Sequence, residues 1–395
     1  PRRNELSQNC CTPPQTASAS AIMSLDSWLI LLQAAEPGSR WPALIRGQNS
    51  IERILKLSRQ EILHAGLGEA DFERLQAPDR ALQNTWREWL GAAPDRRLST
   101  LGSTAYPRLL AELPDAPLAL WARGSRTDLL NGPQLAMVGS CSPTANGRET
   151  AERFAHYFSV RGLTITSGLA TGIDGASHRG ALAGTAGTIA VMGSGPDQLY
   201  SSSLEDLATE IMANGVIVSE YPPGTSAHRD YLPQRNRIIA GMTTGTLVVE
   251  AARRSSSLIT ARLAGEYGRE IFAIPGSIHN PMTKGCHRLI RDGAKLVEDA
   301  ADVLVELAPL LQITVNTDEL CLQSPEDNSH SPTNETGYDE LLAALKFEPC
   351  GINVLAARTE LTAAELSSML LLLEMQGLVE ALPGSRYSLA SKRAP

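Results

Sequence analysis

Short, mostly apolar runs alternate with glycine turns and helical stretches between residues 134 and 297, and this alternation restricts the fold more than any other feature. The runs are 135–138, 163–166, 188–192, 216–218, 246–249 and 271–274. Short runs without polar alternation are typical of strands that are buried on both faces. Strands separated by helices pair in parallel, so we expect an α/β domain with a mostly parallel, doubly wound sheet.

Glycine-rich turns follow several of these runs, at residues 139–144, 167–174, 193–195 and 275–277. The first two turns lead into helical stretches at 147–161 and 173–183. A strand, a glycine turn and a helix surround an anion with backbone N–H groups, and glycine leaves room for a phosphate. One such turn is weak evidence, but the carboxyl ends of neighbouring parallel strands converge on one site. We therefore expect phosphate contacts from Gly139, Ser140, Gly168, Ala170, Gly172, Gly193, Ser194, Gly195 and Gly276.

A local basic patch accompanies the turns, although the chain as a whole is acidic. There are 35 Lys and Arg against 43 Asp and Glu, a net charge of −8. A polyanion must therefore bind to a local patch such as residues 228–262, which hold six arginines and two carboxylates. We expect Arg235, Asn236 and Arg237 to form a surface phosphate clamp and Tyr231 to stack on a base. The alternative is a solvated or salt-bridged helix face, for which Glu250 is a candidate partner.

The sequence offers few candidates for catalysis. His178 has no nucleophile near it in sequence, so we expect a structural hydrogen bond. Glu220 and Glu250 end strands, where carboxylates can act as acids or bases, but no nucleophile or metal cluster accompanies them. Ser257 and Thr260 begin a helix and are expected either to contact phosphate or to cap that helix. We predict no enzyme activity, no catalytic residue, no metal and no cofactor.

Cysteine spacing and hydropathy bear on the cellular compartment. The six cysteines include no CxxC pair and no metal-ligand spacing, which suits a reducing compartment. The N-terminus shows no charged and apolar signal pattern, and no apolar run reaches membrane-spanning length. We therefore expect a cytoplasmic protein that does not enter a membrane.

Composition divides the chain into five parts. Residues 1–24 are polar and are expected to be a disordered tail, residues 25–101 a helical domain, and residues 102–307 the α/β domain. Residues 308–335 are expected to be a flexible linker, because 324–332 are polar and rich in Ser and Pro. Helices followed by a short hairpin predict a winged helix at 336–390. Its residues 370–373 and Met375 are too apolar for solvent, so we expect them to pack in the core or against a partner.

Seven stretches in this order resemble the DprA/Smf family of bacterial DNA-processing proteins. They are 138–140, 167–174 with His178, 219–225, 235–241, 248–251, 257–262 and 275–277. The resemblance implies an extended Rossmann-like domain with an N-terminal helical domain of the SAM or helix-hairpin-helix type and a C-terminal winged helix. It also implies a homodimer that binds single-stranded DNA, protects it from nucleases and loads the RecA recombinase onto it during natural transformation.

Some positions depart from the family pattern. Cys141 stands where the family usually has an arginine that clamps a phosphate, and Gln234 also replaces an arginine. Ser201 replaces a proline, Ser256 replaces a glycine, and Leu232 replaces an aromatic residue that has Tyr231 beside it here. A thiol cannot restore a bidentate, permanently charged contact. We therefore expect Cys141 to weaken the phosphate contact at the first turn relative to the family pattern.

Two enzyme classes remain as alternatives. Phosphoribohydrolases of the lysine-decarboxylase-like family are similar in fold and carry Pro-Gly-Gly-x-Gly-Thr-x-x-Glu, whereas Pro275-Gly276-Ser277 lacks that continuation. A dinucleotide oxidoreductase is less well supported, because Gly193-Ser194-Gly195 lacks the third glycine of the fingerprint. An assay for free base and an NAD difference spectrum distinguish the alternatives.

Overall fold

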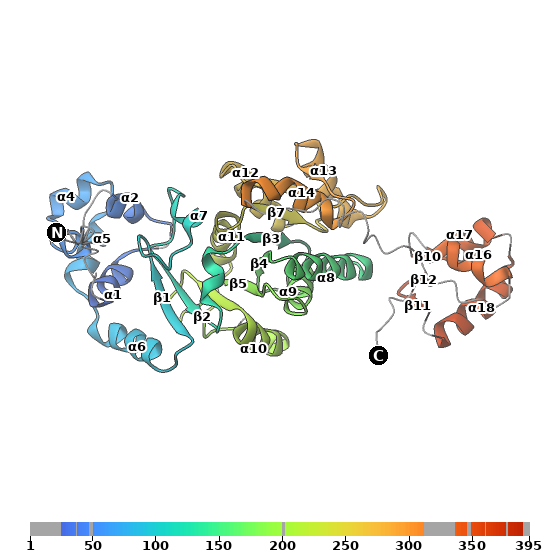
Figure 1. The fold of residues 1–395 in the computed structure, drawn as a ribbon, viewed down its shortest axis with the longest axis horizontal. Helices are drawn as coiled ribbons and strands as arrows, with labels where there is room; N and C mark the ends of the chain where they lie inside the picture. The colour runs from blue at the N-terminus through green and yellow to red at the C-terminus, as the bar shows by residue number, and fades with distance from the viewer. Residues whose placement is uncertain are drawn as a thin grey trace, which may run out of the picture. The chain divides into compact units, whose positions relative to one another are not determined.

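The computed structural model divides into two units, residues 1–315 and residues 316–395 (Figure 1). It describes residues 25–36, 38–46, 50–199, 202–311, 336–345, 349–359, 361–376 and 378–389. The tail expected at 1–24 and residues 312–335 of the expected linker lie outside the described residues. The first four residues of that linker are helical, because α14 (Ala300–Leu311) continues through them.

The first unit is built on a nine-stranded sheet. The strands are β1 (Arg96–Thr100), β2 (Ala119–Arg123), β3 (Gln134–Val138), β4 (Thr164–Gly168), β5 (Thr188–Met192), β6 (Val216–Ser219), β7 (Gly245–Val248), β8 (Glu270–Ala273) and β9 (Lys295–Leu296). Their order is β1-β2-β6-β5-β4-β3-β7-β8-β9. Pairing is parallel from β6 to β9, with Ala136 opposite both Thr166 and Thr246, and antiparallel only at β1-β2-β6. The predicted doubly wound, mostly parallel sheet is confirmed.

Helices cover both faces of this sheet. On one face lie α8 (Ala145–Val160), α9 (Ile173–Leu182) and α10 (Glu205–Asn214), and on the other lie α11 (Tyr231–Met242) and α12 (Ser257–Glu266). Residues along β5 alternate between the two layers, with Ile189 and Val191 packed in the α11 layer and Ala190 and Met192 in the α10 layer. This alternation follows from the period of two in a strand. Smaller elements complete the unit: α7 (Arg108–Ala111), α13 (Lys284–Arg291) and the 3₁₀ turns η1 (Thr127–Asn131), η2 (Ser202–Leu204) and η3 (Pro281–Thr283).

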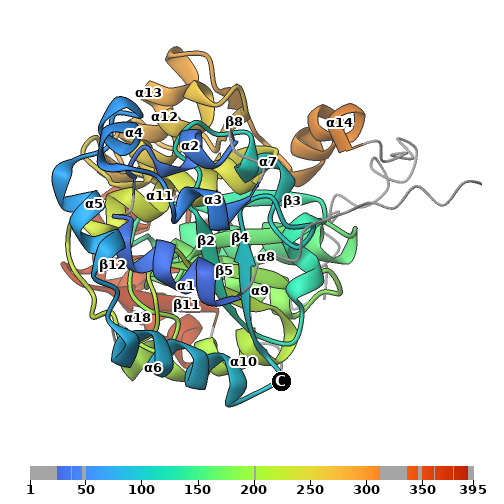
Figure 2. The same ribbon diagram turned by 90° about the vertical axis from the view of Figure 1, so that its left-hand side faces the viewer.

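Among the described residues, six helices precede the sheet and pack in hydrophobic clusters with its strands (Figure 2). They are α1 (Leu25–Ala34), α2 (Trp41–Arg46), α3 (Ile51–Ile54), α4 (Arg59–His64), α5 (Glu69–Gln76) and α6 (Arg80–Gly91). Trp86 of α6 packs edge-on against Trp121 of β2, with 5.6 Å between ring centroids. The expected end of the helical domain at residue 101 is wrong, because 96–100 form β1 of the sheet. The SAM or helix-hairpin-helix type stays a prediction.

The second unit has the winged-helix order of elements, as predicted. These are α16 (Thr336–Leu345), β10 (Cys350–Gly351), α17 (Ile352–Thr359), α18 (Ala363–Met375), β11 (Val379–Leu382) and β12 (Arg386–Leu389). A capping box formed by Thr362 and Glu365 begins α18. Leu366, Leu370 and Leu373 of α18 pack in the core of the unit. No helix of the described residues in either unit is long and apolar enough to cross a membrane.

Candidate nucleic-acid interface

The carboxyl ends of β3, β4 and β7 lie side by side because β4 and β7 flank β3 in the sheet. The Ser140 N–H donates to the Glu250 carbonyl (2.7 Å), and the Ile173 N–H donates to the Ser140 carbonyl (3.0 Å), so the three following loops contact one another. The strand order reverses between β3 and β7, which is where open α/β sheets bind ligands. The expected convergence of the first two glycine turns is confirmed.

Close packing between these loops explains two of their glycines. A Cβ at Gly139 would lie 2.6 Å from Ile173 Cγ1 and 2.8 Å from the Glu250 carbonyl oxygen. Gly172 has a φ of +81°, and a Cβ there would lie 2.3 Å from the Ser140 carbonyl oxygen. Any larger residue would separate the two turns. Both glycines are required by the protein's own packing, and a phosphate is not needed to account for them.

The N-terminus of α8 is occupied by a carboxylate of the protein. Glu250 is buried, and its carboxylate accepts hydrogen bonds from the Thr144 N–H (2.9 Å) and the Thr144 hydroxyl (2.7 Å). The Ser142 N–H of the same turn donates to the Ser140 hydroxyl (3.0 Å). In dinucleotide-binding folds the pyrophosphate lies at this helix N-terminus. Glu250 therefore closes the first turn to a pyrophosphate, which argues against a dinucleotide oxidoreductase.

Two other predicted turns follow β5 and β8, which flank β4 and β7 in the sheet. Gly193, Ser194 and Gly195 are buried, and the Gly195 N–H donates to the Thr225 carbonyl (2.8 Å) of the loop that follows β6. Gly276 follows β8, where a Cβ would lie 2.4 Å from Thr283 Cγ2. These contacts account for Gly195 and Gly276 within the protein's own packing, and a role of these residues in DNA binding stays a prediction.

Arg235 lies beneath the converging turns and not at the surface. Its side chain is 8% exposed, and its Nη1 donates to the Val191 carbonyl (2.6 Å) at the end of β5. The guanidinium crosses Gly168 so closely that a Cβ there would lie 1.9 Å from Nη1. Its Nε donates to the Asn236 side-chain oxygen (3.1 Å), and its Nη2 lies 4.0 Å from Asp174. The expectation of a surface clamp is wrong for Arg235, because the first turns of α11 pack against the sheet.

Arg237 is also buried, and its partners lie before β2 and directly after β6. Its Nη2 donates to both carboxylate oxygens of Glu220, at 2.5 and 2.6 Å, and its Nη1 donates to the Asp115 carbonyl (2.7 Å). The side chains of Arg237 and Glu220 are each 7% exposed. Arg237 therefore fits the salt-bridged alternative and not a surface clamp, but its partner is Glu220 and not Glu250, and the pair is buried.

Two ionisable groups lie in the interior below the turns. Burial raises the pKa of Asp174 to about 6, although Arg235 and a hydrogen bond from Ser167 act in the opposite direction. Burial lowers the pKa of His178 to about 4, so its ring is neutral. The Gly168 carbonyl can only accept, so His178 Nε2 donates to it (3.1 Å). His178 Nδ1 lies 2.7 Å from the Thr188 hydroxyl, which also donates to the Ile165 carbonyl (2.7 Å). The expected structural role of His178 is confirmed.

The exposed rim of the converging loops is formed by small polar side chains and arginines. Cys141, Ser142 and Thr171 are exposed, and burial raises the pKa of the Cys141 thiol, so it is not an activated nucleophile. Arg253 and Arg254 are exposed in the loop between β7 and α12, and no ion pair joins either of them to another described residue. An Arg-Arg pair immediately before a serine-rich helix start was the sequence signal for these two residues.

The start of α12 follows the two arginines. The Ser256 side chain does not cap this helix, but the Ser257 N–H donates to the Ser255 hydroxyl (3.4 Å). Ser257 itself is buried, with its hydroxyl 2.6 Å from that of Ser255. Thr260 is only 1% exposed, so its hydroxyl cannot contact a phosphate in this conformation. The positive end of this helix dipole and the arginines before it favour an anion at the rim.

Tyr231 belongs to a short aromatic stack at the start of α11. Its ring stacks on Tyr221 with 4.1 Å between centroids, and the His228 ring lies 5.4 Å away on a tilt. The Tyr221 hydroxyl donates to the Gln234 side-chain oxygen (2.6 Å). Tyr231 is half-buried, so a base can reach it only on the ring surface that Tyr221 leaves open. Base stacking on Tyr231 stays a prediction.

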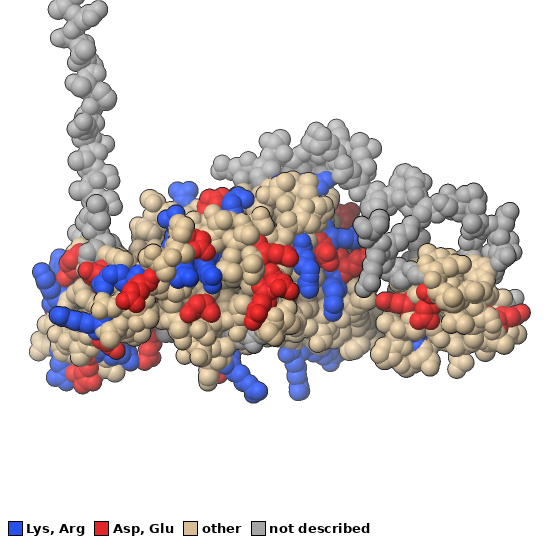
Figure 3. All heavy atoms as spheres, turned by 90° about the horizontal axis from the view of Figure 1, so that it is seen from below, with Lys and Arg blue, Asp and Glu red and all other residues tan. Residues whose placement is uncertain are grey.

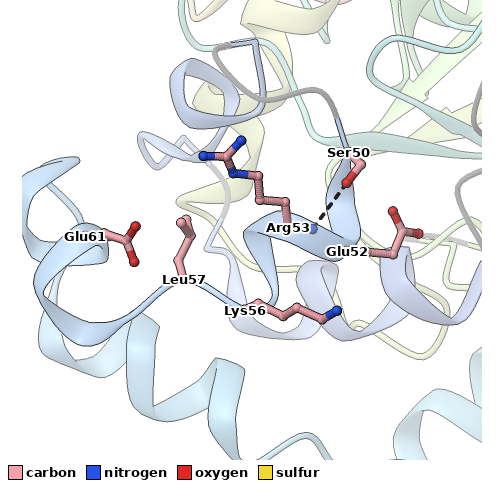
Figure 4. Close-up of a pocket in the computed structure, with 6 residues that line it drawn as sticks. All are labelled: Ser50, Glu52, Arg53, Lys56, Leu57 and Glu61. Atoms are coloured by element: carbon pink, nitrogen blue, oxygen red, sulfur yellow. Dashed lines mark hydrogen bonds between the residues drawn. The ribbon is translucent and has the colours of Figure 1, made fainter.

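A surface pocket lies among the N-terminal helices (Figure 4). It has a volume of about 420 Å³ and is lined by Ser50, Glu52, Arg53, Lys56, Leu57 and Glu61. Ser50 accepts from the Arg53 N–H (3.3 Å) and Glu61 accepts from the Ser58 N–H (2.8 Å), which are helix caps. The lining has two basic and two acidic side chains, and Ser50 and Glu61 are already hydrogen-bonded as helix caps, so this pocket does not favour a polyanion. In the part of the chain that the structure describes, no three His, Cys, Asp or Glu side chains are grouped to hold a metal.

Comparison with known proteins agrees with this architecture. Residues 97–308 match the family model of DNA recombination-mediator protein A, and residues 325–385 match that of the DprA winged helix domain. Protein Smf of Escherichia coli is 37% identical over 316 residues, which cover 78% of this chain and 81% of that protein. DNA processing protein DprA of Streptococcus pneumoniae is 45% identical over 201 residues, covering 51% and 71%.

A solved structure is also similar. The X-ray structure of DNA processing protein A from Streptococcus pneumoniae matches with a TM-score of 0.63 and 35% sequence identity. The match covers 72% of this chain and 99% of that one. The family model alone spans more than half of the 395 residues and includes every strand of the large sheet from Arg97 onward. The chain therefore belongs to the DNA recombination-mediator protein A family, the DprA/Smf family.

Proposed function

We propose that this protein binds single-stranded DNA along the rim formed by the loops after β3, β4 and β7. The observation that carries the proposal is the position of Arg253 and Arg254, exposed and without an ion pair among the described residues, at the point where the strand order reverses. They precede the N-terminus of α12, so two permanent charges and a helix dipole favour phosphates at the same place. Exposed Ser142 and Thr171 supply further hydrogen bonds.

In this proposal the buried residues support the rim. Arg235 donates to the Val191 carbonyl of β5 and lies against Gly168 of β4, and Gly139 and Gly172 allow the turns to approach. Tyr231 provides a ring surface for a base. Contacts that read phosphates and stack on any base are insensitive to sequence. Such a surface suits the transient strand that enters a cell during transformation.

The family relationship supports a wider role. We propose that the protein acts in the cytoplasm as a homodimer, shields the incoming strand from nucleases and transfers it to the RecA recombinase. No bond is made or broken in this role. A test is the rate of RecA filament formation on single strands already covered by a single-strand-binding protein, which should rise when the protein is added.

The experiment that tests DNA binding compares matched single-stranded and duplex oligonucleotides over a series of salt concentrations. If the rim contacts Z phosphates, the logarithm of affinity should fall with the logarithm of salt at a slope of about −0.7Z for the single strand. Equal affinity for the duplex, or no response to salt, would contradict the proposal.

The phosphoribohydrolase alternative finds little support at the site. Glu250 is hydrogen-bonded at the start of α8 and Glu220 is paired with Arg237, so both carboxylates considered for acid or base chemistry are engaged. The loop after β8 also lacks the motif of those enzymes. Release of free base from nucleoside monophosphates at a catalytic rate would restore that alternative.

A further inference from the structure

Helix α18 of the winged helix is apolar on two opposite faces. Leu366, Leu370 and Leu373 point into the core. A second set recurs at i, i+4, i+7, i+8 and i+11, and we call it the outer stripe: Ala364, Ser368, Leu371, Leu372 and Met375. Leu371, Leu372 and Met375 are 58%, 47% and 79% exposed. A helix of a single folded unit needs only one apolar face, so the outer stripe has no role in the core of its own unit.

The outer stripe occupies the position that reads DNA in winged-helix proteins, but its chemistry is unsuited to DNA. In a helix-turn-helix the second helix, here α18, lies in the major groove and contacts bases through Arg, Lys, Asn or Gln. Residues 363–375 include none of these. The hydroxyls of Ser367 and Ser368 donate to the carbonyls of Ala363 (2.7 Å) and Ala364 (3.1 Å), so their protons are used within the helix.

Charge in this unit also disfavours a polyanion. Between residues 336 and 389 there are three Lys and Arg and seven Asp and Glu, a net charge of −4. On the face drawn in Figure 3 the unit shows acidic side chains around a large uncharged area. The two charged residues of α18, Glu365 and Glu374, flank the outer stripe, at about 75° and about 105° from its middle, given 3.6 residues per turn.

We propose that the outer stripe docks an amphipathic helix of a partner protein whose apolar face is flanked by Lys or Arg. The large side chains of Leu371, Leu372 and Met375 supply the knobs, and Ala364 and Ser368 allow close approach at the other end. Glu365 and Glu374 then lie where flanking residues pair across a helix interface. A second copy of α18 would place glutamates against glutamates, so the charges select a basic partner over self-association.

The test uses the full chain and a fluorescent peptide designed as a helix with Leu at heptad positions a and d and Lys at e and g. Anisotropy should show binding, and the double variant Leu371→Gln and Met375→Gln should weaken it about tenfold or more, since truncated apolar anchors dominate such interfaces. Val160→Gln, at a residue of α8 that is 50% exposed, is the matched control and should bind as the parent does. A sister peptide with Glu at e and g should bind at least about tenfold more weakly, because Glu365 and Glu374 would then face like charges.

Three results would overturn the proposal. Equal peptide binding by the parent and the double variant would show that the outer stripe is not the docking surface. Loss of duplex DNA binding in the double variant would assign α18 to DNA. A lower sedimentation mass of the double variant would assign the stripe to a second copy. Unchanged circular dichroism of the Gln variants confirms that folding is not the cause, because both replaced residues are exposed.

Discussion

The pair of Arg237 and Glu220 shows that a charged residue in a basic run can be part of the core. Removing one member of a buried, hydrogen-bonded ion pair leaves the other charge uncompensated. We expect Arg237→Met to lower the free energy of unfolding by about 3–5 kcal/mol, and the double variant Arg237→Met and Glu220→Gln to recover part of that loss. Urea denaturation measures both.

The control is Arg262→Met, because the Arg262 pair with Glu266 is 3.6 Å long and more than half exposed on both sides. An exposed pair contributes about 1 kcal/mol or less, so this variant should unfold nearly as the parent does. An Arg237→Met protein with unchanged stability would show that the pair is not held as described.

Substitution of the exposed arginines Arg253 and Arg254 should lower DNA affinity and not stability, in contrast to substitution of the buried Arg237. Arg253→Ala and Arg254→Ala should each reduce affinity for single strands and make the salt slope shallower by about 0.7, with unchanged thermal melting. Arg288→Ala is the matched control, since Arg288 is exposed but pairs with Asp292 at 3.4 Å. If all three variants lose affinity equally, the protein binds DNA through general charge and not through the rim.

The contributions of Asp174 and His178 to the free energy of unfolding should change with pH in opposite directions. The pKa of Asp174 is raised to about 6, so the folded state keeps a proton that the unfolded state has lost, and its contribution falls as pH rises from about 4 to about 6. The pKa of His178 is lowered to about 4, so its contribution is present above about 6.5 and is lost as pH falls toward 4. Each amounts to about 3 kcal/mol at 1.36 kcal/mol per pKa unit.

Single substitutions separate these two contributions. In Asp174→Asn only the contribution of His178 remains. The free energy of unfolding should therefore rise more steeply between pH 4 and pH 6.5 than in the parent. In His178→Gln only the contribution of Asp174 remains. The free energy of unfolding should therefore fall over the same pH range. Denaturation at a series of pH values checks both signs, and parallel curves for the three proteins would contradict the assignment.

At the scale of elements, the sequence was sufficient wherever burial alone decides structure. The runs at 135–138, 188–192 and 246–249 became β3, β5 and β7 because strands covered on both faces must be apolar along their length. Strand β1 was missed because it lies at the edge of the sheet and its sequence begins Arg96-Arg97. An edge strand has one neighbour and tolerates charge, so it lacks the apolar signal.

The sequence alone did not predict whether the arginines of α11 face the core or the solvent. In α11 both arginines face inward because a glycine at 168 and a carboxylate at 220, both distant in sequence, leave space and charge for them. The turns were likewise recognised as turns, but their glycines serve contacts between loops, such as Gly172 with Ser140. Local composition identifies such residues, whereas only the tertiary structure shows their partners.

At the scale of the whole molecule, the two units have separate cores. The core of the winged helix contains only residues between 338 and 387, and the large core of the first unit contains none of them. Charge is also divided, since the winged helix has a net charge of −4 within a chain of −8. An acidic unit does not add to the attraction between the rim and a polyanion.

A chain that ends at Val315 should therefore keep its fold and its affinity for single strands. We expect calorimetry of the full chain to show two transitions, the larger of which keeps its midpoint in the shortened chain, because no core residue is removed. Affinity for single strands should stay within about threefold of that of the full chain, equivalent to less than about 0.7 kcal/mol. A shortened chain that folds but no longer binds DNA would make the winged helix part of the DNA site, and would contradict both this prediction and the assignment of the outer stripe to a protein partner.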